Sequence, residues 1–208
     1  IVPTAPGGAI DTTARVVAEK LQAKWGKPVI IENRPGAAMR IGADAVTKSP
    51  ADGYTLLVAH DGTMAINPVA FRDLPYDPQK DFEPVGLVVT IPEAVMVNVA
   101  VPAKTVAELV ALAKKEPGKL NYASTGNGAS GHLAGAQLAN AAGIDIVHVP
   151  YKGAAPAVND LLGQQVQLAF FDLPVLLPQV RAGKLKVIAV ASRQRAPSLK
   201  EVPTTAEL

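Results

Sequence analysis

The stretch LNYASTGNGASGHLAG, residues 120–135, passes from a short apolar run through a turn of glycine and hydroxyl residues into a helix. The turn Ser124-Thr125-Gly126-Asn127-Gly128, with Ser130 at the helix start, holds too many small hydrogen-bonding residues for a simple connection. A helix N-terminus carries unpaired N–H groups and about half a positive charge, and glycine lets an anion approach that backbone closely. The stretch therefore predicts a strand–turn–helix unit whose turn binds a small anion.

Two further turns of this kind precede helices. They are Thr4-Ala5-Pro6-Gly7-Gly8, followed by Asp11, and His60-Asp61-Gly62-Thr63. Asp11 is expected to cap the first helix and to support the architecture of its lobe, with ligand contact as the alternative. None of the turns is accompanied by a set of catalytic side chains, so we expect a protein that holds an anion rather than one that transforms it.

Two other groups are expected at the same edge of the sheet, because ligands bind beyond the carboxyl ends of parallel strands. They are Tyr151-Lys152-Gly153-Ala154 and Phe171-Asp172. Lys152 is either a ligand contact or an ordinary surface lysine. Asp172 either caps the helix beginning near Leu173 or accepts a hydroxyl, amide or ammonium group of the ligand.

A dinucleotide site is the main competing interpretation of the 120–135 stretch. Gly126, Gly128 and Gly131 formally satisfy the GxGxxG spacing after a strand. However, the acidic residue required at the end of the next strand is missing, because Asp145 stands at that strand's beginning. The GK[ST] ending of a phosphate-binding P-loop is missing as well. We therefore expect no cofactor.

The three histidines show no metal spacing, and no metal site is predicted. His60 beside Asp61 is compatible with acid–base chemistry or with a polar ligand contact, but no nucleophile accompanies it. His132 in a helix and His148 in a strand are expected to be structural.

Composition excludes several classes of protein. The 208 residues are 49% hydrophobic and 18% charged, with a net charge of +2, which is too even for a nucleic-acid binder. There is no cysteine, hence no disulfide framework and no thiolate nucleophile. No stretch reaches the ~18 apolar residues of a spanning helix, and no signal peptide is present. Because the chain opens in what resembles the tail of a strand, we expect that its ends have been trimmed.

The remaining elements predict an α/β protein of one or two domains. A helix with an apolar stripe runs from about Asp11 or Thr12 to Gly26, and a capping box at Thr105 and Glu108 begins another. Later helices end at glycines expected to be left-handed, Gly143, Gly163 and Gly183. Strands are expected at 28–33, 54–59, 85–90, 94–99, 120–124, 146–149, 166–171 and 185–191, and a short helix at 41–48. Strand and helix signals alternate regularly only after Val101-Pro102. We therefore expect the domain boundary between residues 101 and 102, giving domains 1–101 and 102–208.

Several ordered motifs carry a resemblance over nearly the whole chain. They are IVPTAPGGAIDTTARVVAEKL, ENRPGA, SPADGYTLLVA, INP, LPYDPQKDFEPV, KEPGKLNYASTGNGASGHLAG, VHVPYKGAAPAVNDLLGQQVQLAF and VPTTAEL. With these motifs the chain resembles the Bug-type receptors, the periplasmic solute-binding proteins of tripartite tricarboxylate transport systems.

The resemblance implies a two-lobed type II periplasmic-binding-protein fold with parallel-rich sheets flanked by helices and a ligand cleft between the lobes. In that family the chain returns to complete the first lobe, so the first lobe is expected to be incomplete here. The implied function is that of a monomeric periplasmic receptor that delivers a small carboxylate to the membrane components of the transporter. The alternatives are the effector-binding domain of a transcription regulator with the same fold and, less favoured, a small-molecule enzyme.

The chain departs from the common family pattern around the expected ligand site. An aromatic residue usually stands at Thr4, a glycine at Ala9, and Ser or Asn at His60 and Asp61. The family turn after Gly36 is glycine-rich, whereas Ala37-Ala38-Met39-Arg40 follows here. These differences bear on the identity of the ligand more than on the fold.

Overall fold

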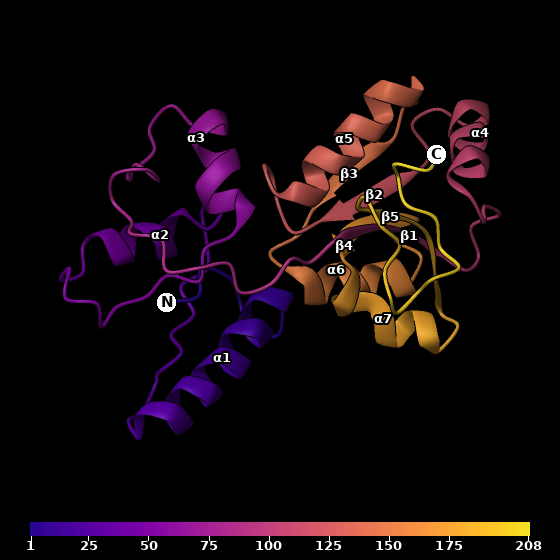
Figure 1. The fold of residues 1–208 in the computed structure, drawn as a ribbon. Helices are drawn as coiled ribbons and strands as arrows, with labels where there is room; N and C mark the ends of the chain where they lie inside the picture. The colour runs from indigo at the N-terminus through magenta and orange to yellow at the C-terminus, as the bar shows by residue number, and fades with distance from the viewer. The chain divides into compact units, whose positions relative to one another are not determined.

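The structure is a computed structural model that describes residues 1–208. It divides into two compact units, Ile1–Val89 and Thr90–Leu208 (Figure 1). The sequence analysis expected the division between residues 101 and 102. The difference arises from strand β1 (Glu93–Asn98), which was expected in the first lobe but pairs with β4 (Leu168–Asp172) and β5 (Leu185–Ala191) of the second unit.

The second unit is built on a five-stranded sheet with the order β3-β2-β4-β1-β5. Strands β2 (Asn121–Ser124), β3 (Val147–Pro150) and β4 run parallel to one another. Strand β1 is antiparallel to both of its neighbours, so it is the one strand that runs against the other four. The expected parallel-rich sheet is confirmed. The carboxyl ends of β2, β3 and β4 meet at one edge, where β1 begins.

Helices cover both faces of this sheet. On one face, α4 (Val106–Lys115) and α5 (Ser130–Ala142) pack through side chains such as Leu109 onto Val95 and Val97 of β1. On the other face, α6 (Ala154–Leu162) and α7 (Leu173–Arg181) pack onto the alternate residues of the same strand (Figure 1). Because β1 is buried on both sides, its sequence is a continuous apolar run, as in a parallel strand.

The helix ends of the second unit follow the predicted signals with two exceptions. Thr105 accepts a hydrogen bond from the Glu108 N–H at 3.1 Å, whereas the Glu108 carboxylate accepts from Lys104, one residue before the cap. Gly143 and Gly183 are left-handed, with φ of 59° and 68°. The prediction for Gly163 was wrong: its φ is −78°, and the left-handed position is taken by Gln164.

The first unit contains α1 (Ala9–Trp25), α2 (Arg40–Thr47), a short π-helical turn η1 (Gly62–Ile66) and α3 (Asn67–Ala70). Helix α1 begins at Ala9 after the N-cap residue Gly8, ahead of the predicted start near Asp11 or Thr12. It ends at the left-handed Gly26, as predicted.

The strands predicted at 28–33, 54–59 and 85–90 are not formed; the first unit holds one isolated parallel bridge, between Val2 and Asn33. A strand requires a hydrogen-bonded neighbour, and few such bonds occur here: Val2 bonds to residues 32 and 34, and Ile1 to 56 and 58. Apolar side chains of the predicted strands therefore remain exposed, among them Tyr54, Val85 and Leu87.

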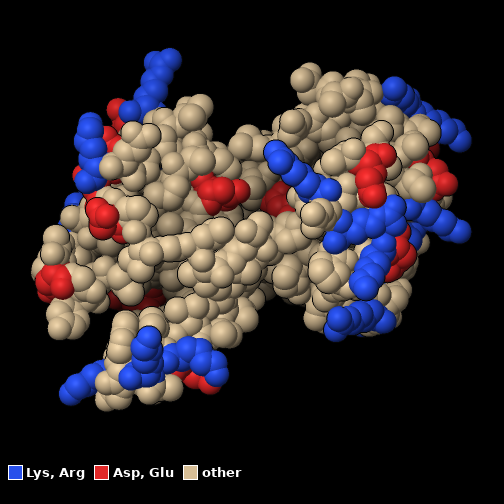
Figure 2. Space-filling model, in the orientation of Figure 1, with Lys and Arg blue, Asp and Glu red and all other residues tan.

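Lys and Arg side chains are interspersed with Asp and Glu over the visible face of both units (Figure 2). Every helix is too short or too polar to span a bilayer.

Candidate functional site

Three of the predicted ligand-binding groups lie at one edge of the second unit's sheet. The 124–128 turn follows β2, residues 151–154 follow β3, and Phe171 and Asp172 end β4. The Tyr151 N–H donates to the Ser124 carbonyl at 3.1 Å, so the first two groups are in direct contact. Each group opens a helix, α5, α6 and α7 respectively.

The backbone of the 124–128 turn depends on its glycines. Gly126 has a φ of 141° and Gly128 a φ of 77°, which side chains disfavour. The Gly126 carbonyl accepts from the Ala129 N–H at 3.2 Å and so closes the turn onto α5. The N–H groups of Thr125 and Asn127 have no acceptor within the chain, and both residues are exposed. The turn thus presents two unpaired N–H groups beside a helix N-terminus, an arrangement that binds anions.

The Ser124 side chain is fully buried and is used inside the turn. Its hydroxyl donates to the Gly126 carbonyl at 3.0 Å and accepts from the Gly126 N–H at 3.2 Å. His148 Nε2 lies 2.7 Å from the same oxygen. Ser124 therefore shapes the turn rather than extending from it.

Two histidines that the sequence analysis treated as structural lie against this turn. His132 Nδ1 accepts from the Gly128 N–H at 3.1 Å. The two imidazole rings are stacked, with centroids 4.0 Å apart and planes inclined by 16°. Burial, together with the nearby His132, lowers the pKa of His148 to about 4. Their proximity could not be read from the sequence because it depends on the register of β3 against β2 and on the packing of α5 against these two strands.

Glu93 was also missed. It stands at the start of β1, opposite Asp172 of β4, and its carboxylate accepts from the Ser130 hydroxyl at 2.6 Å. Recognising that β1 is antiparallel would have placed Glu93 at this edge. Asp172 is the N-cap residue of α7, but its side chain makes no capping hydrogen bond.

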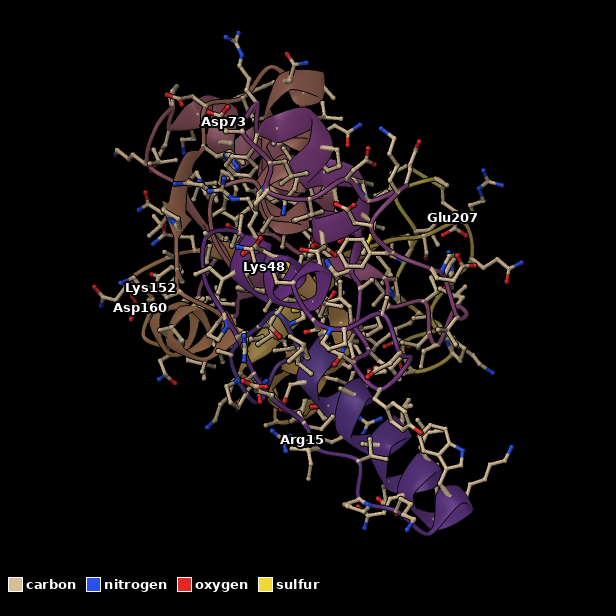
Figure 3. All side chains as sticks on the ribbon, turned by 90° about the vertical axis from the view of Figure 1, so that its left-hand side faces the viewer. Arg15, Lys48, Asp73, Lys152, Asp160 and Glu207 are labelled. Atoms are coloured by element: carbon tan, nitrogen blue, oxygen red, sulfur yellow. The ribbon has the colours of Figure 1, made fainter.

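Residues 151–154 present mixed evidence for a ligand role. The Tyr151 hydroxyl donates to Asp160 of α6 at 2.6 Å. Burial, and to a smaller extent the Asp160 carboxylate, raises the pKa of Tyr151 to about 12. Lys152 is exposed at the outer edge of the view in Figure 3. Gly153 precedes α6 with a φ of 112°. The phenol is thus engaged with α6, and the lysine points to solvent.

In the first unit, Asp11 braces the 4–8 turn. Its buried carboxylate accepts from the Gly7 N–H at 2.9 Å, from Arg15 Nε at 3.0 Å and from Asn33 Nδ2 at 2.9 Å. The Arg15 hydrogen bond is the main cause that lowers its pKa to about 2, against the opposing effect of burial. Arg15 projects from the side of α1 (Figure 3). The Thr4 hydroxyl oxygen is buried and has no hydrogen-bond partner.

The 60–63 turn is held by contacts among its own residues. The His60 N–H donates to the Thr63 hydroxyl at 3.0 Å, which donates to the His60 carbonyl at 2.8 Å. Asp61 contacts His60 Nδ1 and accepts from the Gly62 N–H. Burial acts to raise the pKa of Asp61, but His60 and Gly62 hold it below its ordinary value. Ile1 forms backbone hydrogen bonds with residues 56 and 58, so the segments that precede the 4–8 and 60–63 turns are neighbours.

No three His, Asp or Glu side chains gather in a way that would hold a metal ion. Gly131, which completes the glycine pattern, and Gly135, one turn later, seat α5 on the sheet. A Cβ on Gly131 would lie 2.3 Å from the Phe170 carbonyl oxygen, and one on Gly135 2.3 Å from the Tyr122 ring. The third glycine of the pattern is thus explained by close helix–strand packing.

Comparison with known proteins identifies relatives over the full chain. It is 38% identical over 209 residues to protein BugT of Bordetella pertussis, covering 100% of this chain and 64% of the relative. It is 37% identical over 207 residues to a UPF0065 protein from Pseudomonas sp. strain P51, covering 100% of this chain and 61% of the relative. The chain therefore spans about three fifths of the length of these relatives.

Solved structures give the same result. The Rhodopseudomonas palustris protein Rpa4515 with adipate is 37% identical, with a TM-score of 0.95. The periplasmic binding protein BugD is 39% identical, with a TM-score of 0.92. These two matches each cover 99% of this chain and 69% of the other. MatC from R. palustris with bound malate is 32% identical, with a TM-score of 0.90, over 99% of this chain and 70% of the other.

The family to which these relatives belong consists of periplasmic solute-binding receptors rather than enzymes. This agrees with the expected fold and with the expected class of protein. Residues 13–208 match the family described as "Tripartite tricarboxylate transporter family receptor", and the chain belongs to that family.

Proposed function

We propose that the protein captures a small carboxylate in the periplasm and delivers it to the membrane components of a tripartite tricarboxylate-type transporter. Family membership supports the receptor role. Two structural relatives hold carboxylates, adipate in one and malate in the other. The family description supports a membrane partner of this kind.

The observation that carries the proposal is the 124–128 turn. Its unpaired Thr125 and Asn127 N–H groups and the start of α5 bind one carboxylate without an arginine or lysine clamp. Three or four hydrogen bonds to a charged group are worth about 1.5–3 kcal/mol each. Their sum is about 4.5–12 kcal/mol, and with an association cost of about 4 kcal/mol its upper end reaches the roughly −8 kcal/mol of a micromolar complex.

Other predicted residues have supporting roles in this proposal. The buried, unpartnered Thr4 hydroxyl is a group that a ligand would satisfy. The acidic side chains of Glu93 and Asp172 lie at the edge where the 124–128 turn stands. These side chains repel the carboxylates of adipate and malate alike. Malate also has a hydroxyl group, which can donate a hydrogen bond to Glu93 or Asp172. We therefore expect malate to bind more tightly than adipate.

A thermal-shift panel on the full-length protein tests the proposal, with malate, adipate, succinate and several amino acids and nucleotides as probes. A bound carboxylate at about 100 times Kd stabilises the folded state by about 2.7 kcal/mol. We expect malate to raise Tm. The proposed function is wrong if no carboxylate changes Tm while a nucleotide raises it.

A further inference from the structure

We propose that His132 and His148 are positioning residues that hold the 124–128 turn in the shape that binds a carboxylate, an inference that rests on the proposed function. Each imidazole is linked to one of the two glycines of the turn, and the two rings are stacked on each other. Neither histidine is expected to touch the ligand.

The first link runs from His148 through Ser124 to Gly126. The Ser124 hydroxyl bonds to both the N–H and the carbonyl of Gly126, so it fixes the peptide groups on either side of that residue. With the hydroxyl proton directed to the carbonyl, the 2.7 Å contact is satisfied by an Nε2–H donated from His148. His148 thereby sets the orientation of the Ser124 hydroxyl.

The second link runs from His132 to Gly128. His132 lies in the first turn of α5, and its Nδ1 accepts the Gly128 N–H at 3.1 Å. This bond requires an unprotonated Nδ1 and therefore a neutral ring that carries its proton on Nε2. Gly128 has a φ of 77°, and the bond holds it there.

The rings themselves are held by aromatic packing. Tyr122 of β2 lies 4.9 Å from His148, and Phe170 of β4 meets Tyr122 edge to face at 5.6 Å. The Tyr122 hydroxyl donates to the His132 carbonyl at 3.2 Å. Because the rings stand between two strands and α5, the histidines transmit the position of the sheet to the turn.

The two links divide the N–H groups of the turn into two sets. Those of Gly126 and Gly128 are paired with Ser124 and His132, whereas those of Thr125 and Asn127 are left without an acceptor. The histidines thus determine which N–H groups are available. Without them, Gly126 and Gly128 would be free to rotate, and the orientation of the Thr125 and Asn127 N–H groups would no longer be fixed.

Paired variants separate ring stacking from hydrogen bonding. His132→Phe keeps a ring in the stack and removes the Nδ1 acceptor. His132→Asn removes the ring and keeps an acceptor near the Nδ1 position. His148→Phe and His148→Gln form the equivalent pair for Nε2. Tyr122→Phe, which leaves both histidine links in place, is the control.

Two measurements on the full-length protein decide the proposal. One is the Kd for malate by calorimetry, and the other is the hydrogen-exchange rate of the Gly128 amide by NMR. The Tm in the absence of malate shows whether a variant is folded. We expect His132→Phe to weaken malate binding at least tenfold and to speed Gly128 exchange at least tenfold, with little change in Tm. His132→Asn should stay within about threefold of the wild type in both, despite a lower Tm. His148→Phe should likewise raise the Kd for malate more than His148→Gln does.

The proposal is overturned if His132→Phe binds malate as tightly as the wild type while His132→Asn does not. It is also overturned if both variants leave the Kd and the Gly128 exchange rate unchanged. Failure of the proposed function has a different signature. In that case the wild type binds neither malate nor adipate, while Gly128 exchange still distinguishes His132→Phe from His132→Asn.

Discussion

The 4–8 turn of the first unit and the 124–128 turn of the second both open a helix, yet different chemistry holds them. The first has one glycine at positive φ, Gly7, and the second has two, Gly126 and Gly128. In the first, the ionised carboxylate of Asp11 accepts the Gly7 N–H and pairs with Arg15. In the second, a hydroxyl and neutral imidazoles hold the glycines. In the first turn the Gly7 N–H is already bonded to Asp11, whereas the second brace leaves the Thr125 and Asn127 N–H groups unpaired. The comparison favours the second turn as the stronger carboxylate site.

The largest effect is expected from Gly126→Val. The new side chain has space, since its Cβ would lie 3.7 Å from the Tyr151 carbonyl oxygen, but a φ of 141° is strained for any residue except glycine. The turn should change shape, and malate affinity should fall more than about 100-fold, or about 2.7 kcal/mol.

Two controls accompany this variant. Gly183→Val places the same side chain at a positive φ with nothing within 4 Å, away from the turn, and should lower Tm without changing Kd. Gly7→Val strains the first turn and should weaken malate binding less than Gly126→Val does. A larger loss for Gly7→Val would reverse the comparison.

The charged brace of the first turn is tested by Asp11→Asn. The Asp11 pKa of about 2 lies below its ordinary 3.8, so its stabilisation is complete above about pH 4 and is lost as pH falls toward 2. We expect the free energy of unfolding to fall by about 1–2 kcal/mol at pH 7, a value reduced by the half-exposed Arg15. Denaturation at several pH values should show the variant and the wild type converging near pH 2; a constant difference would contradict this account.

The sequence predicted the second unit far better than the first, for a physical reason. Runs such as 166–171 and 185–191 pair with neighbouring strands in the five-stranded sheet, whereas the equally apolar run 54–59 makes few backbone hydrogen bonds. The direction of β1 could not be predicted, because a strand buried on both faces reads the same whether parallel or antiparallel. Among helix ends, a glycine at position 163 predicted a left-handed residue there, but the residue with positive φ is Gln164.

The candidate site was predictable only in its backbone. Glycine and hydroxyl residues ahead of a helix predict an anion-binding turn from local sequence alone, and the structure forms the turn at the expected place. His148, Glu93 and Asn33 reach their turns from distant segments, so their contacts depend on register and packing. Side chains that act through tertiary contact left no local pattern to find.

The neutral brace of the second turn is tested more gently by Ser124→Ala. The buried hydroxyl is removed and a methyl side chain remains, so the Gly126 N–H and His148 Nε2 both lose their partner. Because the effect on the ligand is indirect, we expect about a fivefold to tenfold rise in the Kd for malate, or about 1–1.4 kcal/mol. Calorimetry measures it, and Ser124→Thr, which keeps the hydroxyl, should restore much of the affinity.

The smallest effect is expected from Lys152→Met. Lys152 is exposed, and an exposed charge near a ligand is worth less than about 1 kcal/mol. The Kd for malate should rise less than threefold and should respond little to salt. A loss above 100-fold, with Gly126→Val close to the wild type, would mean that a salt bridge rather than the backbone holds the anion.

An NMR titration of the full-length protein with malate, followed through the backbone amides, tests the central claim most directly. If the carboxylate is held by the two unpaired N–H groups, the Thr125 and Asn127 amide protons should move downfield more than those of Gly126 and Gly128. Saturation with malate while the Thr125 and Asn127 signals stay in place would show that the 124–128 turn does not hold the anion.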